Sequence, residues 1–258
     1  MGDTPILDAV NVTKRFGGLT AVDGVSFSVA TGMIKALIGP NGAGKSTALN
    51  VVSGVYAPTI GRINLNGREV TGRPSYRFAA MGVARTFQTV QLFGNMTVVE
   101  NVMMGLHTKG RTGLLQGAFR LPWVVREEQR MFGRAMELLA QVGLDARAFE
   151  PATNLPFGQQ RLLEIARALA CEPNLLLLDE PAAGLSMKET EELAALIQTI
   201  RDGGVAVLVV DHDMKLIMEI SDEVVVLDHG RKIAEGTPRE VQTNPAVISA
   251  YLGEELEE

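Results

Sequence analysis

Nine consecutive residues of this sequence have the types and spacing of a loop that binds phosphate. The segment contains Gly39, Pro40, Asn41, Gly42, Ala43, Gly44, Lys45, Ser46 and Thr47, and fits the pattern G-x-x-x-x-G-K-[ST]. Glycines let the backbone curl so that its N–H groups face one anion, and the amino end of a following helix adds partial positive charge. Lys45 is placed to contact β- and γ-phosphates, and the Ser46 hydroxyl to bind Mg²⁺. The loop predicts a nucleoside-triphosphate site.

An acidic pair supplies the groups that such a site still needs. Asp179 and Glu180 directly follow the apolar run Leu175–Leu178. Asp179, at the end of a strand, is placed to hold Mg²⁺ directly or through water. Glu180 is placed to orient or deprotonate an attacking water. A glutamate in this position is usually a loop residue, but directly after a metal-binding aspartate the catalytic role is favoured.

A histidine ends another apolar run. His212 lies between Asp211 and Asp213, after Val205–Val210. Ligands of open α/β sheets bind at the carboxyl ends of strands, so this imidazole is placed to sense the γ-phosphate or orient the water. A lone histidine is more often structural, but its position favours function. His107 and His229 lack such a setting and are interpreted as surface residues.

The elements that must position these residues follow an α/β pattern. Continuous apolar runs predict buried strands of a parallel sheet, and they are Met33–Ile38, Leu175–Leu178, Val205–Val210 and Val224–Leu227. Helical patterns over Leu193–Ile200 and Met214–Ile220 alternate with them. The fold class is therefore α/β, that of a P-loop NTPase with a mainly parallel core sheet.

Near the amino end the pattern changes. Val25–Val29 alternates between apolar and polar residues, and Arg62–Leu65 is followed by the hairpin-turn dipeptide Asn66-Gly67. These features predict a small antiparallel sheet attached to the core.

Strands are scarce between residues 93 and 157. Apolar residues in Glu100–Leu106 and Glu127–Val142 have helical spacing, so both segments are predicted to be helices. Lys109–Pro122 between them is predicted to be a loop. A solvent-exposed loop is favoured over a segment that binds a membrane surface. We interpret residues 1–258 as one domain, in which a helical sub-domain (93–157) is inserted into a core (1–92 and 158–258) that has the antiparallel sub-domain and a C-terminal extension.

Composition excludes several classes of protein. With 258 residues, 46% hydrophobic residues and 21% charged residues, the chain is typical of a globular protein and not of a disordered or collagen-like one. A net charge of −6 argues against a duplex nucleic-acid binder. A lone cysteine, Cys171, gives no disulfide framework. The sequence contains no apolar run long enough to span a bilayer and no signal peptide, so a cytoplasmic protein is expected.

Taken together, these motifs resemble the ATP-binding subunit of ABC transporters, over essentially the whole chain. Gln88, in Arg85-Thr86-Phe87-Gln88, matches the family glutamine that contacts Mg²⁺ and links the core to the helical insertion. His212 matches the family's switch histidine, and Phe16 falls where a family aromatic stacks on adenine. The resemblance implies ATP and Mg²⁺ as ligands, with Glu180, His212, Gln88 and Lys45 as catalytic residues and Ser46, Gln88 and Asp179 on the metal.

The family signature, LSGGQ, contacts the ATP that the opposite subunit holds, and here it departs from the pattern. Its place is taken by Pro156, Phe157, Gly158 and Gln159, which follow Leu155. Pro156 has neither a hydroxyl nor a backbone N–H, so the serine contact of the family is lost, although Gly158 and the amino end of the following helix can still face phosphate. Ser186 replaces the aspartate of the family's D-loop. The altered signature indicates a weakened contact rather than an inactive site, and Ser186 removes a charge from the dimer seam, where a change in cross-talk between the two sites is expected.

Particular stretches look like the branch of the family that takes up branched-chain amino acids, and they are Phe157–Arg161, Asp179–Leu185, Asp211–Lys215 and Asn244–Gly253. The long segment between Gly105 and Glu128 resembles the larger, LivG-type ATPase of such systems. An importer ATPase is therefore expected, peripheral on the cytoplasmic face of the cell membrane. The implied partners are a second ATPase subunit (a different chain, or a second copy), two membrane-spanning permease subunits and, indirectly, an extracytoplasmic substrate-binding protein, with no nucleic acid.

Other functions stay open. ATPases of amide or urea importers and of exporters are similar, and Pro156 and Ser186 suit a regulatory, catalytically weak subunit of a heterodimeric pair. That last alternative is disfavoured by the intact Lys45, Asp179, Glu180 and His212. A soluble ABC ATPase acting on DNA or ribosomes is disfavoured by the single cassette and acidic charge, and a P-loop kinase by the lack of any phosphoryl-acceptor motif.

Overall fold

The computed structural model of the chain describes residues 4–107 and 122–254. The predicted loop Lys109–Pro122 therefore lies outside the described residues, apart from Pro122, which begins a helix. The chain divides into two compact units, one formed by Met1–Gln88 with Asn174–Glu258 and the other by Thr89–Pro173. The sub-domain limits at 93 and 157 stay a prediction. None of the described helices combines the length and the apolar composition that crossing a membrane requires.

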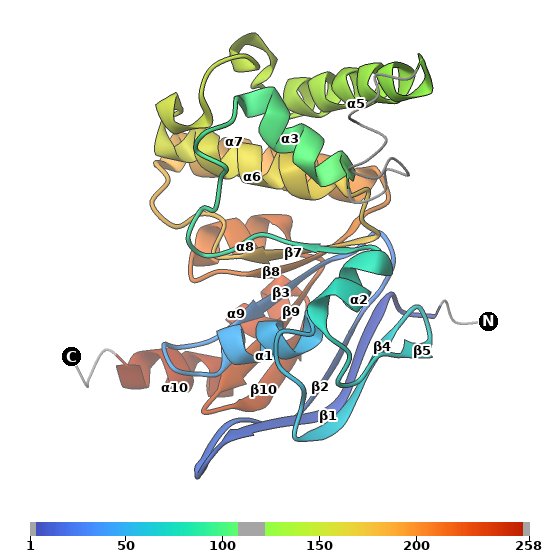
Figure 1. Cartoon of the computed structure of the whole chain (residues 1–258). Coiled ribbons are helices and arrows are strands. Elements are labelled where there is room, and N and C mark those ends of the chain that lie inside the picture. Colours follow the sequence, from blue (N-terminus) through green and yellow to red (C-terminus); the bar gives the residue numbers. More distant parts are fainter. Residues whose placement is uncertain (1–3, 108–121, 255–258) are drawn as a thin grey trace. The chain divides into compact units, whose positions relative to one another are not determined.

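The first unit is built on a six-stranded sheet with the strand order β10-β9-β3-β8-β7-β6 (Figure 1). Its strands are β3 (Ile34–Ile38), β6 (Val83–Arg85), β7 (Leu175–Asp179), β8 (Ala206–Val210), β9 (Glu223–Asp228) and β10 (Arg231–Gly236). Every pair except β9–β10 is parallel. The predicted parallel core sheet is confirmed, and the four apolar runs form β3, β7, β8 and β9.

A second, antiparallel sheet in the same unit has the order β2-β1-β4-β5. Its strands are β1 (Leu7–Phe16), β2 (Leu19–Val29), β4 (Ile60–Leu65) and β5 (Arg68–Glu69). Leu65 pairs with Arg68 across the turn, and Asn66 and Gly67 have φ of 49° and 72°. Positive φ at both turn residues is what a two-residue hairpin needs to match the strand twist. The predicted hairpin is confirmed.

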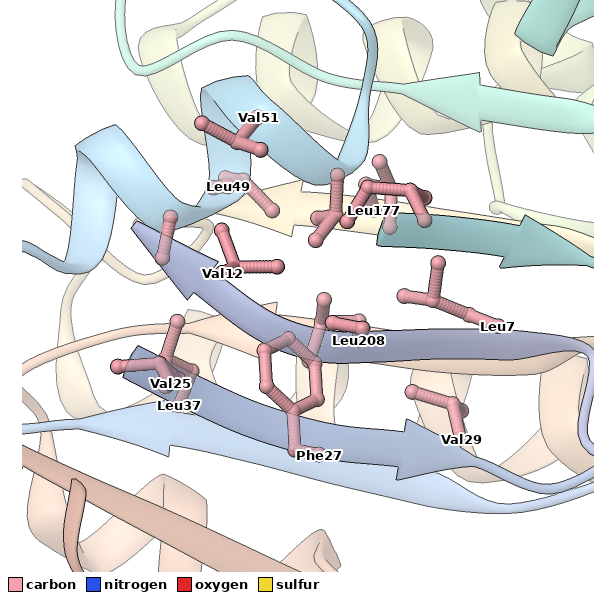
Figure 2. Close-up of a cluster of buried hydrophobic side chains, with 14 of the residues drawn as sticks. Leu7, Val12, Val25, Phe27, Val29, Leu37, Leu49, Val51, Leu177 and Leu208 are labelled. Carbon is pink, nitrogen blue, oxygen red and sulfur yellow. The ribbon is translucent and has the colours of Figure 1, made fainter. Parts of the chain in front are cut away.

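One hydrophobic core joins the two sheets (Figure 2). It contains Leu7 and Phe27 of the antiparallel sheet and Leu177 and Leu208 of the parallel sheet. Leu49 of α1 (Lys45–Val52) belongs to the same core. Full burial of a side chain of this size contributes about 1.5–3 kcal/mol, so the packing fixes α1 firmly against the sheet.

The first unit also contains five helices besides α1 among its described residues. α7 (Met187–Asp202) contacts both β8 and α8 (Met214–Ile220). Because α1 and β2 also contact β8, this strand is apolar and buried at every position. The remaining helices are α2 (Ser75–Ala80), α9 (Pro238–Gln242) and α10 (Pro245–Glu254).

The second unit is helical. It contains α3 (Val98–Leu106), α5 (Pro122–Gln141), α6 (Phe157–Ala170) and the short 3-10 turns η2 (Asp145–Arg147) and η3 (Ala152–Asn154). The three helices contact one another in pairs (Figure 1). Gly105 permits the close approach of α3 to α6, because a Cβ there would lie 2.4 Å from the Arg167 carbonyl oxygen.

Candidate active site

The phosphate-binding loop connects β3 to α1 and passes close to two other segments. Gly39 has φ of 150°, and a Cβ at this position would lie 2.0 Å from the Leu227 carbonyl oxygen. Gly44 has φ of 96°, and its Cβ would lie 2.4 Å from the Ala21 carbonyl oxygen. Glycine is therefore required at both ends of the loop, for its backbone conformation and for space.

Lys45, the first residue of α1, folds its side chain back over this loop. Its Nζ donates hydrogen bonds to the carbonyl oxygens of Gly39 and Pro40, at 2.7 and 2.8 Å. Only 8% of the residue is exposed. The ammonium is thus held in place by the loop at the amino end of a helix, where the backbone also favours an anion.

A cavity of about 510 Å³, the size of a small-molecule site, opens at the loop. The residues that line it are Leu19, Thr20, Ala21, Asn41, Gly42, Ala43, Gly44, Lys45, Ser46, Thr47, Glu180, His229 and Gly230. It brings together the predicted binding residues from Asn41 to Thr47 and the predicted catalytic Glu180. Gly39 and Pro40 contribute through their bonds to Lys45.

Two further segments line the cavity that the sequence did not reveal, the beginning of a strand and a turn. Leu19–Ala21 belongs to β2, and His229-Gly230 joins β9 to β10. Gly230 N donates to Ala43 O at 3.0 Å, which holds the His229-Gly230 turn against the phosphate loop. His229 was predicted to be a surface residue. Its side chain is 95% exposed, and the residue also lines the cavity.

The acidic pair lies at the end of β7. Asp179 is 6% exposed, and its Oδ2 accepts a hydrogen bond from Arg85 Nη2 at 2.8 Å. Glu180 leaves the strand with a positive φ of 46°, and its N–H donates to Val210 O at 2.7 Å. This turn directs the chain away from β7 as soon as the strand ends.

Gln88 meets Glu180 directly. Its Nε2 donates to Glu180 Oε2 at 2.9 Å, although the two residues are 92 positions apart in the sequence. Because Glu180 lines the cavity, the structure brings a carboxylate and the amide that holds it to the same place.

His212 follows β8, which neighbours β7 in the sheet. Asp211 Oδ2 accepts from Ala182 N at 3.0 Å, and so joins the chain after β8 to the chain after β7. The His212 imidazole is 66% exposed, with its Nδ1 3.8 Å from Asp211 Oδ1. His212 therefore lies at the same edge of the sheet as Glu180, with an open side chain.

Phe16 is placed differently. It ends β1 and is 42% exposed, and it is not among the residues that line the cavity. Its ring packs edge-on against Tyr56, with ring centres 5.3 Å apart, and Lys14 Nζ lies 5.0 Å from its centre. The structure does not bring this ring into the cavity wall.

The signature residues belong to the second unit. Pro156 caps α6 with φ of −55° and ψ of 155°, without a side-chain hydrogen bond. Phe157 is 47% exposed, and the Arg161 guanidinium lies over its ring, 5.9 Å from the ring centre. Gly158 is buried, and Gln159 Oε1 accepts a hydrogen bond from Arg147.

Ser186, which stands where the family has an aspartate, caps α7. Its hydroxyl donates to Glu189 Oε2 at 2.7 Å and accepts from Glu189 N at 3.4 Å. The hydrogen bonds from the Ser186 side chain and backbone keep the pKa of Glu189 below its ordinary value. The serine thus has a local role in starting the helix.

The donor atoms of the predicted metal ligands suit a hard cation. In the described part of the chain, no three His, Cys, Asp or Glu side chains are grouped so as to hold a metal ion. Ser46, Asp179 and Gln88 instead offer hydroxyl, carboxylate and amide oxygens. Mg²⁺ prefers oxygen ligands and takes several from water and substrate phosphates. The residues therefore fit a Mg²⁺ ion that binds together with a nucleotide.

Comparison with known proteins decides the family. The family model described as ABC transporter matches residues 22–183, which include the phosphate loop, Gln88 and the acidic pair. The chain belongs to the ABC transporter family. A second model, described as branched-chain amino acid ATP-binding cassette transporter, matches residues 231–257 of this cassette.

Individual relatives agree. The cassette is 48% identical to the high-affinity branched-chain amino acid transport ATP-binding protein BraF of Pseudomonas aeruginosa, over 97% of this chain and 98% of the relative. It is 47% and 45% identical to the corresponding LivG proteins of Salmonella typhimurium and Escherichia coli K12, with the same coverage.

Solved structures share the fold. A nucleotide-free ATP-binding cassette from an ABC transporter superposes with a TM-score of 0.83 at 32% identity, covering 96% of this chain and 99% of that one. The ADP conformation of an ABC transporter cassette gives a TM-score of 0.85 at 32% identity, covering 97% and 99%. The cassette is an ABC ATPase and binds nucleotide.

Proposed function

We propose that the cassette binds and hydrolyses ATP to energise an importer of branched-chain amino acids. The observation that carries the ATPase assignment is the cavity lined both by the phosphate loop and by Glu180. The import of branched-chain amino acids is supported by the BraF and LivG relatives and by the family model that matches residues 231–257.

ATP occupies the cavity with its phosphates on the amides of Asn41–Thr47. Lys45, already held by the loop, contacts the β- and γ-phosphates, and the Ser46 hydroxyl, Asp179 and Gln88 hold Mg²⁺. A Mg²⁺ ion held by these residues would neutralise negative charge on the phosphates. Phe16, which is 42% exposed, stacks on adenine.

Hydrolysis needs one water and one base. Glu180 takes a proton from the water while the water oxygen attacks the γ-phosphorus. The bond from that phosphorus to the bridging oxygen breaks, and ADP and inorganic phosphate are released. Gln88 orients the Glu180 carboxylate, and His212 contacts the γ-phosphate. Lys45 and the loop amides stabilise the developing charge.

Two ATPase subunits close on each other with each ATP between one phosphate loop and the other subunit's signature. Gly158 and the amino end of α6 provide the signature's contact, since Pro156 lacks an N–H. The partner ATPase is a different chain or a second copy. Together they dock on two permease subunits at the cytoplasmic face of the membrane, and an extracytoplasmic protein delivers the substrate.

The ATPase role is tested by the solution mass of the Glu180→Gln protein with ATP and Mg²⁺, beside wild-type phosphate release. If the mass of Glu180→Gln doubles with ATP and the unmutated protein hydrolyses ATP, two copies of this chain can form an active pair. If Glu180→Gln binds ATP but stays a monomer, and the unmutated protein barely hydrolyses ATP, the partner ATPase is a different chain. Wild-type turnover retained by Glu180→Gln overturns the role of Glu180.

The substrate is tested with the complete transporter in vesicles. Labelled leucine, isoleucine and valine are expected to enter in an ATP-dependent way, and urea and acetamide are not. Uptake of an amide in place of leucine would move the cassette to the related amide importers, and efflux would make it an exporter ATPase.

A further inference from the structure

Arg85 joins the acidic pair to the helix that follows the phosphate loop. It is the last residue of β6, and its Nη2 donates to Asp179 Oδ2 at 2.8 Å. Its Nη1 donates to Asn50 Oδ1 and to Ser53 Oγ, each at 2.7 Å. The side chains of Arg85 and Asp179 are only 12% and 9% exposed.

The partners of Arg85 lie on two elements that must agree in position for a metal to bind. Asn50 lies in α1 and Ser53 caps its carboxyl end, while Ser46, at the other end of α1, offers the hydroxyl ligand. Asp179 ends β7. A planar guanidinium holds its hydrogen bonds in a fixed fork, so Arg85 ties the Asp179 carboxylate to α1, which the hydrophobic core already holds against the sheet.

Fixing one carboxylate oxygen fixes the other as well, because the carboxylate is planar. Arg85 binds Oδ2, and so determines where Oδ1 of Asp179 points. A second contact supports the same alignment, since Asp179 N donates to Thr86 Oγ1 at 3.4 Å and Thr86 N donates to Leu177 O at 3.0 Å. The Arg85–Gln88 segment therefore runs along the end of β7.

We propose that Arg85 is a positioning residue for the metal site: it holds the Asp179 carboxylate against α1 in the orientation that binds Mg²⁺ with the nucleotide. This inference rests on the role proposed for Asp179. Groups that hold a metal ligand in place change metal affinity about 10- to 100-fold when they are removed.

The experiment measures ATP binding by the full chain in a Glu180→Gln background, in EDTA and at graded Mg²⁺ concentrations. Mg²⁺ is expected to increase ATP affinity, and Arg85→Met should raise the Mg²⁺ concentration that gives half of this increase about 10- to 100-fold. ATP affinity in EDTA should be unchanged. Arg85→Lys keeps the charge but cannot span all three partners, and an intermediate value is expected. Arg68→Met, an exposed arginine of β5, is the matched control.

The urea midpoint of each nucleotide-free variant reports folding, and Arg85→Lys carries the test if Arg85→Met does not fold. Unaltered Mg²⁺ dependence in the folded Arg85 variants overturns the proposal, as does an equal loss of ATP affinity with and without Mg²⁺, which would show a merely structural role. Asp179→Asn separates the two hypotheses. If Asp179→Asn leaves the Mg²⁺ dependence of ATP affinity unchanged, the metal role of Asp179 fails. If Asp179→Asn changes that dependence and the Arg85 variants do not, only the inference about Arg85 fails.

A double variant completes the comparison. If Arg85 acts through Asp179, adding Arg85→Met to Asp179→Asn produces no further change in Mg²⁺ dependence. Additive effects would overturn the inference.

Discussion

Gln88 donates a hydrogen bond to Glu180, with 2.9 Å between Nε2 and Oε2. Three residues earlier, Arg85 is bonded to Asp179, so the last residue of β7 and the residue that follows it are each bound from the same segment. A displacement of that segment would therefore move the proposed base and the proposed metal ligand together.

Replacing Glu180 by Gln is expected to reduce ATP turnover about 10²- to 10⁴-fold, because the amide cannot take a proton from water. ATP binding should persist, since Lys45 and the loop are unchanged. Phosphate release and equilibrium ATP binding measure the two effects. Glu69→Gln, on exposed β5, is the control for loss of one carboxylate, and normal turnover in Glu180→Gln would exclude the role.

Replacing Lys45 by Ala removes the only side-chain ammonium among the residues that line the cavity. A hydrogen bond to a charged group contributes about 1.5–3 kcal/mol, so the dissociation constant of ATP should rise about 10- to 150-fold. Calorimetric titration measures this change. Lys188→Ala, whose side chain is 86% exposed, should bind ATP normally; equal affinities in the two variants would contradict the assignment.

The two glycines Gly39 and Gly42 should respond differently to alanine. At Gly39 the new Cβ would lie 2.0 Å from Leu227 O, whereas at Gly42, with φ of 76°, nothing lies within 4 Å. We expect Gly39→Ala to lower the free energy of unfolding by about 3 kcal/mol, and Gly42→Ala by about 1 kcal/mol from backbone strain alone. Urea unfolding compares them, and a smaller loss for Gly39→Ala would show that the loop is not held against β9.

Acid should remove the contribution of Glu189 to stability. The hydrogen bonds of Ser186, its side chain first, lower the pKa of Glu189 from an ordinary 4.5. Since the folded pKa is the lower one, the contribution is complete above the unfolded pKa and disappears as pH falls through the folded pKa. Glu189→Gln should therefore differ from wild type more at pH 6 than at pH 3 in urea unfolding. An equal difference at both values would refute this, with Glu69→Gln as control.

Local patterns were enough to predict the parallel strands and the phosphate loop. β7 and β8 are apolar at all but one position because both faces are covered, and Asn66-Gly67 specifies its own backbone conformation. The Gly39–Thr47 pattern likewise depends on neighbouring residues, so its place between β3 and α1 followed from the sequence.

Contacts between distant segments were not predictable in this way. β6 has three residues, too few for a periodic signal, and Arg85 meets Asp179 across 94 positions. His229 gave no signal because its role in the cavity wall depends on the bond from Gly230 to Ala43. The Phe16 contact with Tyr56 similarly depends on how β1 lies beside the chain after α1.

The left-handed backbone at Glu180 sets stability and turnover against each other. Glutamate adopts φ of 46° at a cost of about 1–2 kcal/mol, which glycine would avoid and asparagine would reduce. Either replacement should make the chain more resistant to heat while removing the base. A library ranked by melting temperature alone would therefore enrich inactive transporters at this position, and thermostabilisation of the cassette has to be screened by turnover as well.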